Sequence, residues 1–76
     1  MKNEKNPIQV ADRLFGALEY LAGRDSAGLM EIANALGLNK STTHRILRSL
    51  IHLGYVTQDE QSGKYMLTAK LADIMN

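Results

Sequence analysis

The first regular pattern in the chain is an apolar stripe between Val10 and Ala22. Its side chains recur at intervals of three and four residues, which is the spacing of one buried face of an α-helix. They are Val10, Leu14, Ala17, Leu18 and Leu21. Gly23 and the polar residues after it end the stripe, so the pattern predicts an amphipathic helix over residues 10–22. We expect residues 1–7 to form a flexible tail in front of this helix.

A second, shorter apolar pattern follows a loop that contains Gly28. Leu29 is placed to supply a short strand, and a helix is predicted to begin near Met30. The buried side of this helix consists of Ile32, Ala33 and Leu36. Gly37 stands where a left-handed C-terminal cap needs a residue without Cβ, which predicts a tight turn after the helix.

The third stretch runs from Lys40 to Leu53, and its two sides differ in character. With a rotation of about 100° per residue, the apolar side consists of Thr43, Ile46, Leu47, Leu50 and Leu53. The opposite side consists of Ser41, Arg45, Arg48 and His52, with His44 at the flank. The sequence leaves open whether Leu38 or Asn39 holds the N-cap position of this helix.

A β-hairpin and a last helix are predicted after the third stretch. Tyr55 to Thr57 and Tyr65 to Leu67 are short runs of β-prone residues, and Ser62-Gly63 between them suits a turn. Thr68 is placed to cap the final helix. The elements together predict a mainly α fold with a small β-hairpin, which is a winged helix-turn-helix.

Composition limits the classes of function. The 76 residues, 45% of them hydrophobic, suffice for one small globular domain with a thin core. The chain has no cysteine, which excludes disulfides and thiol catalysis, and we expect neither a metal nor a cofactor. No apolar run approaches the roughly 20 residues that span a bilayer, and the first residues lack the apolar stretch of a signal peptide. We therefore expect a cytoplasmic protein that does not contact membranes.

The charges are unevenly distributed, although the formal net charge is only +1. No acidic residue occurs between Glu31 and Asp59, whereas Lys40, Arg45 and Arg48 all lie in that stretch. These cations are also compatible with an ordinary solvated helix face, but such a face usually mixes charges of both signs. We therefore interpret the polar side of the 40–53 helix as a nucleic-acid-binding surface.

Two helices joined by a tight turn place the second helix in the major groove of double-stranded DNA. Arg45 and Arg48 are expected to read guanine, because a planar guanidinium donates to O6 and N7 together. Lys40 is expected to bind a phosphate as a point charge. Ser41 and Thr42 either contact phosphate or base edges at the helix N-terminus or only stabilise its first turn.

Resemblance to a known family is carried by three segments. They are Gly37-Leu38-Asn39-Lys40-Ser41-Thr42-Thr43-His44-Arg45-Ile46-Leu47, Leu53-Gly54-Tyr55-Val56 and Gly63-Lys64-Tyr65-Met66-Leu67. They closely resemble the IclR family of bacterial transcription regulators, and the similarity covers the chain from about Val10 to its end. Asn39 and His44 lie within the motif and are counted among the expected DNA contacts. The sequence departs from the family at Asn39, where proline is often found, and at Thr68, where glycine is common.

The resemblance implies an organisation as well as a function. Residues 8–67 form the DNA-binding domain, and residues 68–76 begin a linker helix. A full-length homodimer is implied, which binds a pseudopalindromic operator as a transcription regulator, such as a repressor. A small-molecule effector acts only through a C-terminal domain that is absent from this chain.

The predicted hairpin is expected to make weaker DNA contacts than the helix. Gln61, Ser62 and Lys64 at its tip are suited to phosphate, while Asp59 and Glu60 make it acidic near its base.

Two other classes of function compete with DNA binding. A winged helix also serves as a protein-protein interaction module without DNA readout, but its third helix should then present an apolar or acidic front. An enzyme needs a cleft with a nucleophile, a base and an orienting group, and Ser41 with His44 has no third member. We expect no enzymatic activity.

Overall fold

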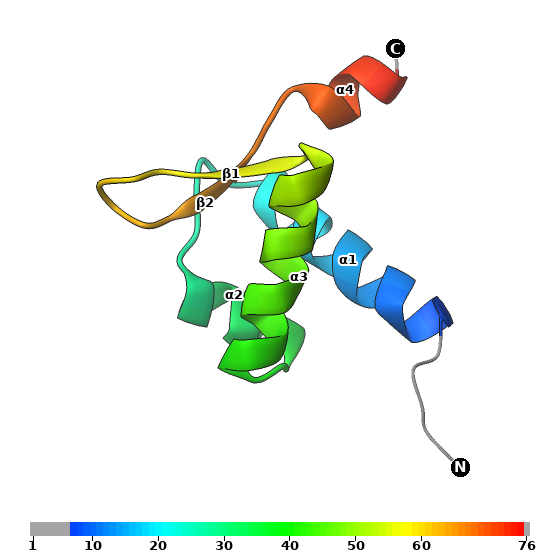
Figure 1. Ribbon diagram of the computed structural model, residues 1–76, viewed down its shortest axis with the longest axis vertical. Coiled ribbons are helices and arrows are strands. Elements are labelled where there is room, and N and C mark those ends of the chain that lie inside the picture. The colour runs from blue at the N-terminus through cyan, green and yellow to red at the C-terminus, as the bar shows by residue number, and fades with distance from the viewer. Residues whose placement is uncertain (1–6, 76) are drawn as a thin grey trace.

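The computed structural model describes residues 7–75, which form four helices and one hairpin (Figure 1). In chain order the elements are α1 (Pro7–Ala22), α2 (Leu29–Leu36), α3 (Lys40–Leu53), β1 (Val56–Gln58), β2 (Tyr65–Leu67) and α4 (Lys70–Met75). The predicted mainly α fold with a small hairpin is therefore confirmed.

Helix α1 begins at Pro7, ahead of the apolar stripe and inside the segment predicted as a tail. Proline suits the first position of a helix, because its fixed φ is helical and its missing N–H has no partner to lose there. The prediction of a flexible tail otherwise concerns residues 1–6, which lie outside the described residues.

The turn between α2 and α3 has the geometry that the sequence predicts. Gly37 is left-handed, with φ 68° and ψ 32°, and the backbone N–H of Leu38 donates to the carbonyl of Ala33 at 3.0 Å. Asn39 is the N-cap of α3, because its Oδ1 accepts the backbone N–H of Thr42 at 2.8 Å. The choice between Leu38 and Asn39 is thus decided by a side-chain hydrogen bond.

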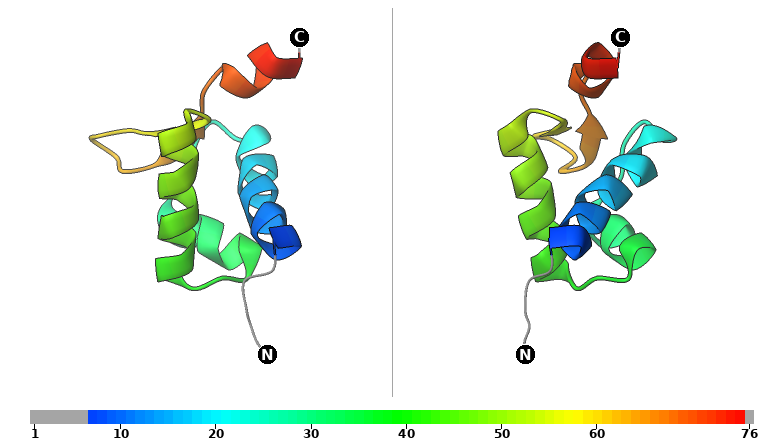
Figure 2. Two further views of the ribbon diagram at one scale, coloured as in Figure 1. Left: turned by 45° about the vertical axis from the view of Figure 1, so that its right-hand side comes forward. Right: turned by 90° about the vertical axis from the view of Figure 1, so that its right-hand side faces the viewer.

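The core lies where α1, α2 and α3 meet and where the hairpin closes one end of the helices (Figure 2). Its buried hydrophobic residues are Ala17, Leu18, Leu21, Ala27, Ile32, Leu47, Leu50, Val56 and Tyr65. Two residues expected on buried stripes are exposed instead, Val10 by 40% and Leu53 by 48%. Val10 lines a groove between α1 and α3, and Leu53, in the last turn of α3, borders a shallow depression beside His52.

The short strand expected at Leu29 is wrong, because Leu29 is the first residue of α2. A single β-bridge forms instead at Ala27, whose N–H donates to the carbonyl of Tyr65 at 2.9 Å and whose carbonyl accepts at 2.8 Å. Helix α2 begins early because the backbone N–H of Gly28, its N-cap, donates to the carboxylate of Glu31 at 3.4 Å.

The hairpin of β1 and β2 is antiparallel, and we call residues 56–67 the wing. The first strand begins at Val56, one residue later than predicted, and pairs Val56 with Leu67 and Gln58 with Tyr65. Gly63 has φ 76° in the connecting loop, so the turn prediction is confirmed. After the wing, Thr68 Oγ1 accepts the backbone N–H of Lys70 at 3.2 Å, so Thr68 bonds the first residue of α4 from two positions ahead, while Ala69 stands directly before the helix.

Candidate nucleic-acid interface

The structure brings the largest group of predicted site residues together on the outward face of α3. Its exposed residues are Lys40, Ser41, His44, Arg45, Arg48, Ser49 and His52. Among residues 7–75 a single ion pair forms, between Arg24 and Glu31. No described carboxylate therefore pairs with Arg45 or Arg48. We call this surface the recognition face. It presents cations and hydroxyl groups to solvent, while the back of α3 packs into the core.

The N-terminal end of α3 is organised by Asn39. Its side chain accepts the N–H of Thr42, and its carbonyl accepts both the backbone N–H of Thr43 at 3.1 Å and the Thr43 hydroxyl at 2.8 Å. Thr43 is fully buried, as the sequence predicts. The N–H of Thr42 is therefore already occupied, and Thr42 is half-buried beside α1. Lys40 and Ser41 are the exposed residues at this end of the helix.

The wing ends in a loop over residues 59–64 that side chains hold in shape. The carboxylate of Asp59 accepts the backbone N–H of Ser62 at 2.7 Å, and this hydrogen bond lowers the pKa of Asp59. Ser62 Oγ accepts the N–H of Lys64 at 3.2 Å. Gln58 Nε2 donates to the carbonyl of Gly63 at 2.9 Å. The loop thus has a defined shape, closed by its own polar groups.

The position of the acidic residues in the wing differs from the prediction. Asp59 and Glu60 were expected near its base, but both lie beyond the last strand pair, in the same loop as Gln61, Ser62 and Lys64. The first strand ends at Gln58, one residue later than predicted, and Gln58 pairs with Tyr65, so the acidic residues fall in the loop that follows. The tip therefore carries both acidic residues beside its single lysine.

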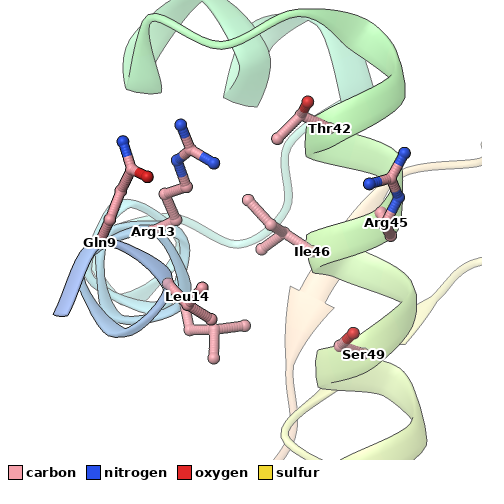
Figure 3. Close-up of a pocket in the computed structure, with 8 residues that line it drawn as sticks. Gln9, Arg13, Leu14, Thr42, Arg45, Ile46 and Ser49 are labelled. Atoms are coloured by element: carbon pink, nitrogen blue, oxygen red, sulfur yellow. The ribbon is translucent and has the colours of Figure 1, made fainter. Parts of the chain in front are cut away.

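A groove of about 250 Å³ lies between α1 and α3, at the edge of the recognition face (Figure 3). Helix α1 contributes Gln9 and Arg13 to its rim, and α3 contributes Arg45 and Ser49. Sequence reasoning missed Gln9, Arg13 and Ser49. The spacing of four residues indicates that Gln9 and Arg13 share one side of α1, but no sequence signal shows that this side borders α3.

The C-terminal end of α3 is joined to α4 by side chains. The Thr68 hydroxyl donates to the carbonyl of Gly54 at 2.6 Å, and Lys70 Nζ donates to the carbonyl of Leu53 at 2.6 Å. Lys70 Nζ also lies 5.0 Å from the centroid of the Tyr55 ring. We call these contacts the α3–α4 clamp. They satisfy carbonyl groups that the end of a helix otherwise leaves unpaired.

Other kinds of site find no support in residues 7–75. These residues contain no group of three or more His, Asp or Glu side chains placed to hold a metal ion. No helix among them has both the length and the apolar character needed to cross a membrane.

Comparison with known proteins identifies the family. Residues 10–60 match the model of the IclR helix-turn-helix domain. The chain belongs to the IclR family. The glycerol operon regulatory protein of Streptomyces coelicolor is 48% identical over 65 residues, which cover 84% of this chain and 26% of that protein. The IclR domain described here thus spans about a quarter of the length of this curated relative.

Solved structures place the IclR domain among winged helices. The crystal structure of Pseudomonas aeruginosa HmgR matches with a TM-score of 0.79 and 26% identity, over 88% of this chain and 28% of that chain. The Zalpha domain of a cyprinid herpesvirus protein, whose structure concerns its binding to Z-DNA, matches with a TM-score of 0.71 and 26% identity. That match covers 76% of this chain and 95% of the viral chain.

Proposed function

We propose that this domain binds a double-stranded DNA operator sequence-specifically, as the DNA-binding part of a bacterial transcription regulator. The observation that carries the proposal is the recognition face, which presents Lys40, Arg45 and Arg48 without a described carboxylate partner. The major groove is about 12 Å wide and accepts a single helix. Family membership supports the same function, because the relative described above is named as an operon regulator.

Each part of the interface has a distinct role in this proposal. Arg45 and Arg48 read bases, since arginine forms paired hydrogen bonds with guanine. Lys40 binds phosphate, and Ser41 and His44 contact phosphate or base edges beside it. Asn39 and Thr42 act chiefly by holding the first turn of α3 in place.

The wing has a smaller role. Gln61, Ser62 and Lys64 approach phosphate more weakly than α3 does, because Asp59 and Glu60 lie in the same loop.

The full regulator is proposed to act as a homodimer on a pseudopalindromic operator. Two recognition helices related by a two-fold axis read two half-sites of inverted sequence. An effector-binding domain beyond α4 completes the regulator, and the location of its operator on the bacterial chromosome puts the protein in the cytoplasm. No catalytic step is proposed for this domain.

A titration with DNA tests the proposal. We expect the protein to bind a labelled random duplex with an affinity that falls steeply as salt rises, and to enrich a defined sequence from a random duplex pool. A single strand of the same composition is the control. Failure to bind the duplex at low salt would favour the alternative, a winged-helix module that binds another protein.

A further inference from the structure

The two flanks of α3 differ in charge. The wing and the N-terminal half of α1 lie on opposite sides of α3 in Figure 1 and in the left view of Figure 2. The wing side ends in the loop that contains Asp59, Glu60 and Lys64. The α1 side presents Gln9 and Arg13 at the rim of the groove. A polyanion that lies across α3 therefore meets a net acidic loop on one flank and a cation on the other.

The groove beside α1 is continuous with the recognition face. Arg45 and Ser49 line this groove and also line the shallow depression that contains Arg48 and His52. The groove also has an apolar lining, to which Val10, Leu14 and Ile46 contribute. Its polar lining residues include Arg45 and Ser49, which also belong to the recognition face.

The side chains of Gln9 and Arg13 point in a common direction. In Figure 3 both extend along the groove toward the end of α3 that carries Thr42. No hydrogen bond or ion pair was found for the Arg13 guanidinium within residues 7–75. Asp12, its neighbour in sequence, is turned by about 100° around α1 and does not line the groove. The donors at this rim are therefore available to an anion.

We propose that Arg13 and Gln9 bind a backbone phosphate of the DNA. This phosphate belongs to a strand at the edge of the major groove that α3 occupies. This inference rests on the proposed function. The sugar-phosphate backbones run along both edges of the major groove, so the elements beside an inserted helix face phosphates. A guanidinium donates to two phosphate oxygens at once, and the Gln9 amide adds a neutral donor next to it. On this protein α1, rather than the wing, supplies the stronger grip on the backbone.

The salt dependence of binding tests this phosphate contact. We expect Arg13→Met, which keeps an apolar stem over the groove, to weaken binding to random and selected duplexes alike. The slope of log Kobs against log salt should become shallower by about 0.9, the contribution of one phosphate. Arg24→Met is the matched control, because it removes the same charge from a guanidinium held beside Tyr20 and Glu31. An unchanged slope for a folded Arg13→Met protein would overturn the inference.

A measurement on the wild-type protein guards against a variant that does not fold. The NMR signals of the Arg13 Nε–H and the Gln9 side-chain amide should shift when random duplex is added, while the Arg24 Nε–H stays in place. A shift with inorganic phosphate but none with duplex would make the groove a small-anion site and overturn the proposal. If the wild-type protein does not bind duplex, the proposed function fails as well. If it binds duplex and these signals do not move, the α1 contact alone fails.

Discussion

Two arginines on α3 are the residues on which sequence readout depends in the proposed function. Arg45→Ala and Arg48→Ala should each weaken binding to the selected operator by about 1–3 kcal/mol, the range for a paired contact with guanine. Both side chains are exposed, so the fold should survive, as circular dichroism can verify. Unchanged operator affinity in both folded variants would remove the recognition face from the mechanism.

Lys40 is expected to contribute affinity without sequence information. Lys40→Ala should lower affinity for operator and random duplex by the same factor and make the salt slope shallower by about 1, because phosphates are alike along the duplex. Titrations of both duplexes at several salt concentrations measure the two effects. A loss confined to one base position would show that Lys40 reads sequence instead.

Glu31 links the charge state of the protein to its stability. Its carboxylate accepts the Tyr20 hydroxyl at 2.8 Å and the Gly28 N–H, and these bonds lower the pKa of Glu31 below its ordinary 4.5. A carboxyl with a lowered folded-state pKa stabilises the fold above its unfolded pKa, and this contribution disappears as pH falls through the folded pKa. Wild type should therefore exceed Glu31→Gln in stability at neutral pH and lose that advantage in acid.

Urea denaturation at pH 7 and about pH 3 checks this behaviour, since protonation below the ordinary carboxyl range removes the contribution. Glu19→Gln, at an exposed position of α1, supplies the matched control. An advantage of wild type that is equally large in acid would contradict the role given to the Glu31 carboxylate.

At the scale of elements, the turn between α2 and α3 depends on the backbone of Gly37. A Cβ at this position would meet no atom within 4 Å, so only its left-handed φ of 68° opposes a side chain. Gly37→Ala should destabilise the fold by about 1–2 kcal/mol, the cost of that conformation for an L-residue, and Gly37→Asn should cost less. Thermal or urea unfolding measures both. Gly23→Ala is the control, because its Cβ also meets no atom and its φ is not positive; equal losses at the two positions would contradict the argument.

The elements that sequence predicts well are those whose signal repeats along the chain. The helix over residues 40–53 has a long apolar stripe, a cap at Asn39 and a glycine at its end, and its predicted bounds agree with the structure. The bridge at Ala27 involves a single residue, so no alternation of polar and apolar side chains marks it. The strand ends were predicted to within one residue, but the acidic wing tip was misplaced because sequence does not show how the loop folds on its own side chains.

At the scale of the whole molecule, the composition of the candidate interface could be predicted but its extent could not. The cationic face of α3 follows from helical rotation, which is a local property of the sequence. The position of Arg13 across the groove from Arg45 depends on how α1 crosses α3, and a crossing angle is set by packing between residues far apart in sequence. The α1 flank therefore became visible only in three dimensions.

A single domain should bind its operator weakly, because one recognition helix reads only a few base pairs. Joining two copies raises the effective concentration of the second copy without any new contact. A dimerising coiled coil fused after Asn76 should therefore tighten binding to a duplex with two half-sites far more than binding to one half-site. The half-site centres should lie about one helical turn, or a multiple of it, apart.

Titration of fused and unfused proteins against both duplexes measures this effect. Equal gains on one half-site and on two would rule out the dimeric mechanism.

The α3–α4 clamp ties the start of α4 to the end of α3 by hydrogen bonds. Helix α4 projects from the body of the domain, away from the tip of the wing (Figure 1), and Lys70 Nζ in its first turn donates to the Leu53 carbonyl at the end of α3. If the proposed function holds, a rotation of α4 should reach α3 through these hydrogen bonds to the carbonyls of Leu53 and Gly54. In the proposed function, a rotation of α4 outside the DNA should then change the tilt of α3 in the major groove.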